Sequence, residues 1–150
     1  MLDRGRTYLV YEKRMEKTAC VVRELSKAGS SLLTITRLHP DLIAEKMELN
    51  ASDPIWLSER AGRRNASPNQ LNRLYQMISA FLSEHQDGTV VLEGVEYLLQ
   101  YNDLKRLMAM IEKINDLVML SQAVLIMPMD PLTLDSRTLA YLRRSAEIIE

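Results

Sequence analysis

Short apolar segments rich in β-forming residues alternate along this chain with longer segments whose apolar residues recur at helical spacing. Two of the short segments, "VVL" (90–92) and "VLIM" (124–127), are continuously apolar, as expected for strands that are covered on both faces. Because strands that alternate with helices pair in parallel, the pattern predicts an α/β fold, a three-layer sandwich around a mainly parallel five-stranded sheet. The five predicted strands are residues 7–12, 31–37, 54–59, 89–93 and 123–128.

The segments between these strands carry signals for helices and their ends. Helices are predicted at 13–28, at 39–47 and from 95 to about 120. "YND" (101–103) is expected to interrupt the third of them, with Asn102 or Asp103 capping the part that follows. Ser67 is expected to cap a further helix, with Pro68 at its first position. The last helix is predicted to begin at Asp135 or Ser136 and to turn four side chains inward: Leu139, Leu142, Ala146 and Ile149.

The sequence also predicts the burial of two side chains and the mobility of one loop. Trp56 lies within a predicted strand, so its indole is expected in the core. Cys20 lies on a predicted helix between Ala19 and Val21, so it is expected to be a buried small hydrophobe. "RAGRRNAS" (60–67) is polar and contains a glycine and three arginines, so we expect a mobile loop there.

Length, charge and cysteine content narrow the class of protein. A chain of 150 residues predicts a single domain over 1–150. A net charge of −1 provides no basic field, so sequence-independent nucleic-acid binding is not expected. One cysteine allows no internal disulfide and fits a reducing compartment. The N-terminal residues do not resemble a signal peptide, and no apolar run approaches about 20 residues, so we expect a cytoplasmic location without direct membrane contact.

The residues that follow the predicted strands form the candidate site, because open parallel sheets bind ligands outside the carboxyl ends of their strands. Five residues at these positions are the candidates for a ligand- or partner-binding surface: Arg37, Ser58, Glu93, Glu96 and Asp130. The neighbouring loop adds three cations that could grip a phosphate or an acidic peptide: Arg60, Arg63 and Arg64. An alternative remains open, in which Arg37 pairs with Glu93 or Asp130 and only closes this edge of the sheet.

The segment after the first predicted strand argues against nucleotide hydrolysis. A phosphate-binding loop has the pattern G-x-x-x-x-G-K-[ST], whose glycines let backbone N–H groups approach phosphate oxygens. Here the segment is "EKRMEKTACVVREL", which retains Lys17-Thr18 but has Glu12 and Glu16 and no glycine. Carboxylates repel phosphate at short range. We therefore predict no catalytic residues, no metal and no cofactor, and a chain that is not an enzyme.

Several segments together resemble a known family. They are "TYLVYE", "LLTITRLHPD", "PIWLSE", "VVLEGVEYLLQYND" and "MDPLTLDSRTLAYLRR". From about Gly5 to Arg144 the chain resembles an archaeal family of unknown function, DUF835. The wider pattern resembles a RecA/KaiC-type ATPase core without its phosphate loop, which implies the strand order 5-1-4-3-2. In the family the fourth strand usually ends in Asp-Gly, and Glu93 stands here in place of that Asp.

The resemblance also implies a class of function. Family members often carry this domain beside sensory or histidine-kinase modules, which implies a non-catalytic module for signalling or protein interaction. Its expected partners are sensor or kinase domains that contact the strand-end cleft and the arginine loop, and a homodimer is an open alternative. Two other functions stay open: a nucleotide or phosphate sensor that uses Arg37 and the loop arginines, and a metal-dependent hydrolase around Glu93, Glu96 and Asp130.

Overall fold

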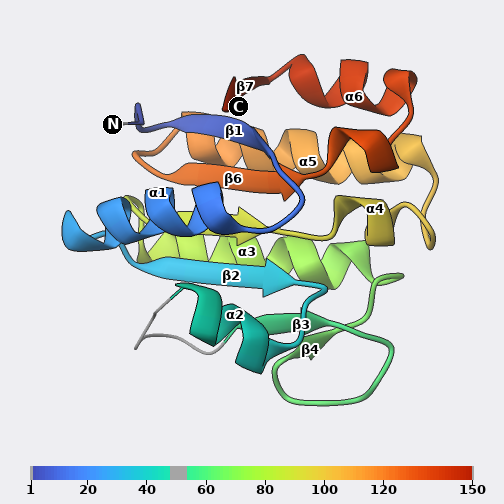
Figure 1. The fold of residues 1–150 in the computed structure, drawn as a ribbon, viewed down its shortest axis with the longest axis horizontal. Coiled ribbons are helices and arrows are strands. Elements are labelled where there is room, and N and C mark those ends of the chain that lie inside the picture. Colours follow the sequence, from blue (N-terminus) through green and yellow to red (C-terminus); the bar gives the residue numbers. More distant parts are fainter. Residues whose placement is uncertain (1, 48–53, 150) are drawn as a thin grey trace.

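A computed structural model describes residues 2–47 and 54–149, and these form one seven-stranded sheet with every strand parallel to its neighbours. Across the sheet the strand order is β4-β3-β2-β5-β6-β1-β7 (Figure 1). The strands are β1 (Arg6–Tyr11), β2 (Leu32–Thr36), β3 (Ile55–Leu57), β4 (Asn65–Ala66), β5 (Thr89–Leu92), β6 (Val124–Met129) and β7 (Ala146–Ile149). The predicted α/β class and parallel sheet are therefore confirmed.

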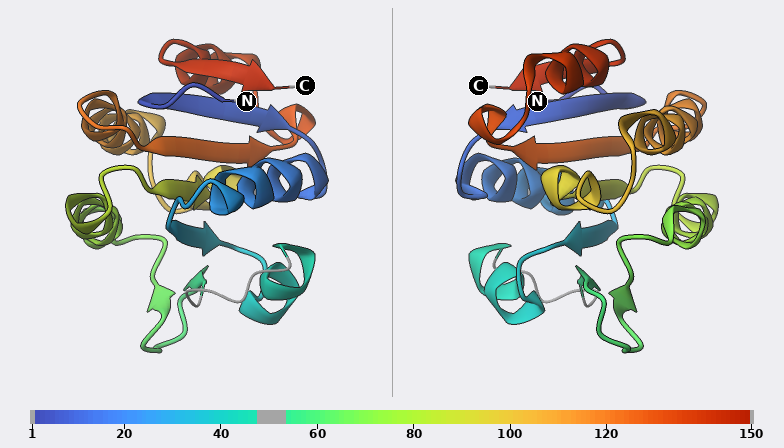
Figure 2. Two further views of the ribbon diagram at one scale, coloured as in Figure 1. Left: turned by 90° about the vertical axis from the view of Figure 1, so that its left-hand side faces the viewer. Right: turned by 90° about the vertical axis from the view of Figure 1, so that its right-hand side faces the viewer.

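Helices cover both faces of the sheet (Figure 2). One face carries α1 (Glu16–Lys27) and α2 (Pro40–Met47), and the other carries α3 (Leu71–Glu84) and α5 (Leu104–Met119). Three short elements follow the strands: α4 (Val95–Leu98), the 3₁₀ helix η1 (Pro131–Thr133) and α6 (Ser136–Arg143). None of the described helices is both long and apolar enough to cross a membrane.

The two faces of the sheet bury separate cores because successive side chains of a strand point to opposite faces. On β1, Leu9 packs into the core under α3 and α5, whereas Tyr8 and Val10 pack into the core under α1. On β5, Val90 and Val91 divide in the same way. Both cores are continuous across the central strands, which holds the strand ends in fixed register.

The sheet contains two strands that the sequence analysis missed. β4 lies inside the segment 60–67, which was predicted to be a loop, and its two residues pair with Trp56 and Leu57 of β3. β7 begins at Ala146, where the last helix was predicted to continue, so Ala146 and Ile149 belong to a strand. β7 pairs only with β1 among the described strands, and such a short edge strand carries little apolar periodicity.

The predicted strand order was also wrong. Numbered along the chain, the five predicted strands lie in the order 3-2-4-5-1 rather than 5-1-4-3-2. The physical reason is that β6 lies between β1 and β5, and that β2 pairs directly with β5. If β3 and β4 are set aside and β7 is counted, the remaining five strands do lie in the order 5-1-4-3-2.

Helix ends agree with the sequence at two of three positions. The carboxylate of Asp103 accepts a hydrogen bond from the Arg106 N–H at 2.8 Å, and Asp135 caps α6 in the same way. The predicted cap at Ser67 is wrong, because α3 begins at Leu71. The Ser67 hydroxyl instead donates to the side chain of Asn69 in the turn before the helix.

Two predictions of burial also differ from the structure. Cys20 lies on the solvent face of α1 and is exposed, because the buried stripe of this helix runs through Ala19, Val22 and Leu25. Trp56 is only partly buried, since β3 lies near the edge of the sheet and its other neighbour is the two-residue β4.

Candidate functional site

The carboxyl ends of β1, β2, β5 and β6 surround a cavity of about 210 Å³, which we call the strand-end pocket. Six charged residues line it: Glu12, Lys13, Arg14, Glu93, Glu96 and Asp130. Three of the predicted site residues therefore share one pocket, while Arg37 and Ser58 are outside its lining. The position agrees with the rule that open parallel sheets place their clefts at this edge.

The side-chain carboxylate of Glu12 accepts hydrogen bonds at the N-terminus of α1. One carboxylate oxygen accepts the Lys17 N–H at 2.8 Å. The other accepts the Thr18 N–H at 2.9 Å and the Thr18 hydroxyl at 2.6 Å. These N–H groups have no intrahelical partner and favour an anion, because the helix dipole is positive at this end. The carboxylate thus takes the place that a phosphate takes in a phosphate-binding loop.

Glu93 ties the end of β5 to the end of β2. Its Oε1 accepts hydrogen bonds from the Thr36 hydroxyl and from the Arg37 N–H, both at 2.9 Å. The Glu93 N–H donates to the carbonyl of Ile35, which continues the ladder between the two strands. These bonds occupy one carboxylate oxygen of Glu93 with the last residue of β2 and the residue that follows it.

Glu96 and Asp130 complete the acidic side of the strand-end pocket. Partial burial raises the pKa of Glu96, a backbone hydrogen bond opposes this rise, and the negative charges of Glu93 and Asp130 add to it. Asp130 caps η1, since its Oδ1 accepts the Leu132 N–H at 3.0 Å. Within the part of the chain that the structure describes, no group of three or more acidic, histidine or cysteine side chains could hold a metal ion.

The side chain of Arg37 lies outside the strand-end pocket and packs against two aromatic rings. Its guanidinium carbon is 4.5 Å from the centroid of the Tyr97 ring and 5.8 Å from that of Trp56. Its Nη1 donates to the carbonyl of Leu57 at 3.3 Å, and its own carbonyl accepts the indole N–H of Trp56 at 3.1 Å. Among the described residues it makes no ion pair with Glu93 or Asp130, so the edge is not closed in the way the open alternative required.

Two further ring contacts extend this cluster. His39 packs on Trp56 with centroids 5.2 Å apart, and Tyr101 packs on Tyr97 at 5.1 Å, both edge-on. The hydrogen bond with Tyr97 is the main cause that raises the pKa of Tyr101 to about 12. We call this set of exposed and partly buried residues the arginine–aromatic surface: Arg37, His39, Trp56, Tyr97 and Tyr101.

The sequence analysis placed only Arg37 of this surface among the candidate site residues. Trp56 was assigned to the core. The one available signal was the four-residue spacing of Tyr97 and Tyr101 after the fourth predicted strand, which places the two rings on one side of a helical turn.

The remaining predicted residues lie on the connection between β3 and β4. Ser58 is buried, and its hydroxyl accepts the Arg60 N–H at 3.1 Å, so it holds a turn. Arg60, Arg63 and Arg64 are exposed, and the carbonyl of Arg64 accepts the Trp56 N–H. The loop arginines therefore adjoin the strand that carries Trp56, beside the arginine–aromatic surface rather than around the pocket.

Together these features define an open, parallel α/β domain whose strand-end edge has an acidic pocket on one side and an arginine–aromatic surface on the other. The chain belongs to the family described as Protein of unknown function (DUF835), whose model matches residues 11–145. This membership confirms the resemblance to DUF835 that the sequence motifs indicated. No curated protein matches the chain.

Proposed function

We propose that this domain is a non-catalytic signalling and protein-interaction module, a degenerate relative of RecA/KaiC-type ATPases that works with sensory or histidine-kinase systems. The observation that carries the proposal is the Glu12 carboxylate on the N–H groups of Lys17 and Thr18. A nucleotide phosphate would have to displace this carboxylate and then sit beside its negative charge. The N-terminus of α1 therefore binds the chain's own carboxylate, which stabilises the helix, and does not bind a nucleotide phosphate.

The strand order supports the proposed descent from the RecA/KaiC type. Five strands, β7-β1-β6-β5-β2, lie in the order 5-1-4-3-2 that this type of core implies. In this comparison β3, β4 and their connection are an addition at one edge; β3 carries Trp56, and the connection carries the loop arginines. The added edge thus coincides with the surface for which we propose a partner.

The arginine–aromatic surface is our proposed contact surface. Arginine, tryptophan and tyrosine dominate the binding energy of protein interfaces. Arg37 is exposed yet already ordered by Leu57, Trp56 and Tyr97, so a partner would lose little additional side-chain entropy there. A partner that presents an acidic side chain to Arg37 matches its charge.

Binding of purified sensor and histidine-kinase domains from the same organism tests the proposal. We expect one of them to bind in biolayer interferometry and expect Arg37→Glu to weaken that affinity at least about tenfold, the effect of losing a hot-spot residue. The matched control is Lys27→Glu at the exposed end of α1, where the strands begin (Figure 1). Absence of binding, or equal effects of the two charge reversals, would contradict the proposal.

The sensor alternative makes the opposite prediction for nucleotides. If the chain sensed nucleotide or phosphate through Arg37 and the loop arginines, ATP or inorganic phosphate would raise its melting temperature, and Arg37→Glu would abolish the rise. We expect no rise that depends on Arg37.

A further inference from the structure

A second cavity, of about 710 Å³, lies at the opposite edge of the sheet. Its lining comes from the start of β1, from α5 and its connection to β6, and from the junction of α6 and β7. We call it the amino-edge cavity. Its volume falls in the range of about 300–1,000 Å³ that is typical of small-molecule sites. No residue of the strand-end pocket or of the arginine–aromatic surface contributes to it.

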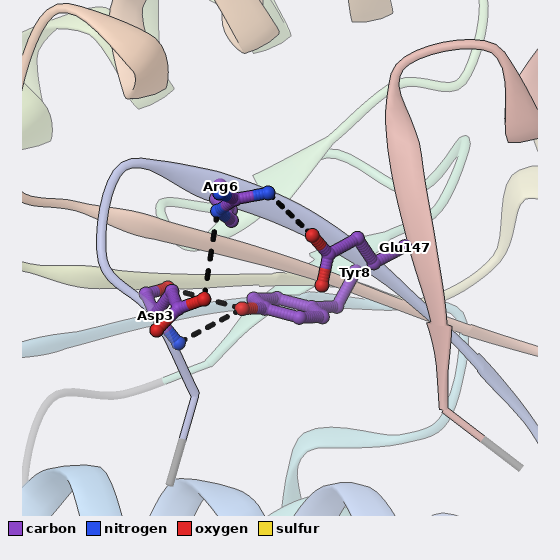
Figure 3. A network of polar contacts seen from close by, with 4 residues as sticks. All are labelled: Asp3, Arg6, Tyr8 and Glu147. Carbon is purple, nitrogen blue, oxygen red and sulfur yellow. Dashed lines mark hydrogen bonds and ion pairs between the residues drawn. The ribbon is translucent and has the colours of Figure 1, made fainter.

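One wall of the amino-edge cavity is fixed by a network around Arg6 (Figure 3). The Arg6 guanidinium contacts the carboxylate of Glu147 on β7 and lies 3.7 Å from that of Asp3. The Tyr8 hydroxyl accepts the Asp3 N–H at 2.9 Å, which holds the segment before β1. Because two carboxylates compensate Arg6, this wall is structural and joins β7 to β1.

The lining of the cavity includes the buried side-chain amide of Asn115, whose NH₂ group has only a weak acceptor among the described residues. Thr7 and Asn115 are only 2% and 6% exposed, and the Thr7 hydroxyl donates to Asn115 Oδ1 at 2.7 Å. Among the described residues, Asn115 Nδ2 donates only to the sulfur of Met119, at 3.2 Å. A thioether is a weak acceptor, and buried amide donors normally find a stronger one. An acceptor oxygen of a ligand would satisfy this group.

The rim of the cavity carries positive charge. Its lining contains Arg4, Arg6 and Arg144 against the single carboxylate of Glu147, a balance of +2. Arg4 donates to the neutral carbonyls of Asp87 and Gln122 and forms no ion pair within residues 2–47 and 54–149. Arg144 is exposed over the ring of Tyr141 and forms no ion pair with any described residue.

We propose that the amino-edge cavity binds a small organic anion. Its carboxylate or phosphate group lies against Arg4 and Arg144, since guanidinium groups bind both anions through paired hydrogen bonds. A further acceptor oxygen of the ligand takes an N–H of the Asn115 amide, whose one described acceptor is the Met119 sulfur. This site goes beyond the interaction function proposed above and does not depend on it.

Titration of the full chain with citrate and with inorganic phosphate, followed by ¹H–¹⁵N NMR, tests this site. We expect saturable changes in the backbone signals of residues 5–7 and 145–147, with a Kd below about 10 mM for at least one probe. The tighter probe shows whether the site selects carboxylate or phosphate. Arg144→Gln is expected to weaken binding at least about fivefold through the loss of a charge-assisted contact.

The matched control is Arg143→Gln, the exposed neighbour that does not line the cavity, which should bind like the wild type. Both variants change exposed side chains, so both should fold. The proposal is overturned if neither probe gives saturable changes, if sodium chloride at equal ionic strength reproduces them, or if the two variants weaken binding equally.

Discussion

Glu12 stabilises the start of α1 through three charge-assisted hydrogen bonds. We predict that Glu12→Gln lowers the free energy of unfolding by about 1–2 kcal/mol, because a neutral amide accepts these bonds more weakly and cannot fill both acceptor roles. Urea denaturation measures the loss. Glu16→Gln, at an exposed position in the same helical turn, should cost less, about 0.5 kcal/mol, because only its interaction with the helix dipole is removed. Equal losses would show that the Glu12 bonds contribute nothing specific.

Glu96 should give the protein a measurable pH dependence. Its pKa is raised above 4.5, mainly by burial, so the folded chain holds this proton more tightly than the unfolded chain does. Its contribution to stability is therefore fully present below pH 4.5 and is lost as the pH rises through the raised pKa. Glu96→Gln cannot ionise, so we predict that its stability relative to the wild type increases from about pH 4 to about pH 7. Denaturation at several pH values measures this, and a difference that stays constant or shrinks would contradict the assignment.

At the scale of elements, Gly94 allows β5 to turn into α4 beneath Arg37. Its φ is +110°, and an added Cβ would lie 3.2 Å from Arg37 Cβ and from Leu57 Cδ1. Gly29 is the matched control, because its φ is +92° and an added Cβ would contact nothing within 4 Å. We predict that Gly94→Ala costs at least about 1 kcal/mol more than Gly29→Ala, since both add backbone strain but only one also adds a clash. Chemical denaturation of the two variants compares them, and equal costs would mean that the Gly94 site has room to relax.

The sequence predicts the central elements well and the peripheral ones poorly, for a physical reason. β5 and β6 are continuously apolar because both of their faces are buried, and Asp103 and Asp135 cap helices through contacts within a few residues. β4 has only two residues, and β7 begins at Ala146, shortly after α6 ends at Arg143. Neither strand is therefore long or separate enough to show an alternation of apolar and polar residues. They become strands by pairing with β3 and β1, which are tertiary contacts that local pattern does not contain.

For the molecule as a whole, the sequence analysis brings three of the candidate residues to one pocket but does not predict the aromatic residues beside it. Rules for parallel sheets bring Glu93, Glu96 and Asp130 to one pocket, as the structure also does. The contact between Arg37 and Tyr97 depends on the direct pairing of β2 with β5, which the predicted strand order lacked. The wrong order therefore hid the contact of Arg37 with Tyr97, whereas the neighbouring strand that carries Trp56 was predicted correctly.

The N-terminus of α1 is occupied by the carboxylate of Glu12, so we expect it not to bind nucleotide. The most direct measurement follows the backbone N–H signals of Lys17 and Thr18 by ¹H–¹⁵N NMR while ATP and Mg²⁺ are added to the full chain. Because both groups are already bonded to Glu12, we expect their chemical shifts to stay unchanged. Saturable shifts of these two signals at one equivalent of ATP would contradict it.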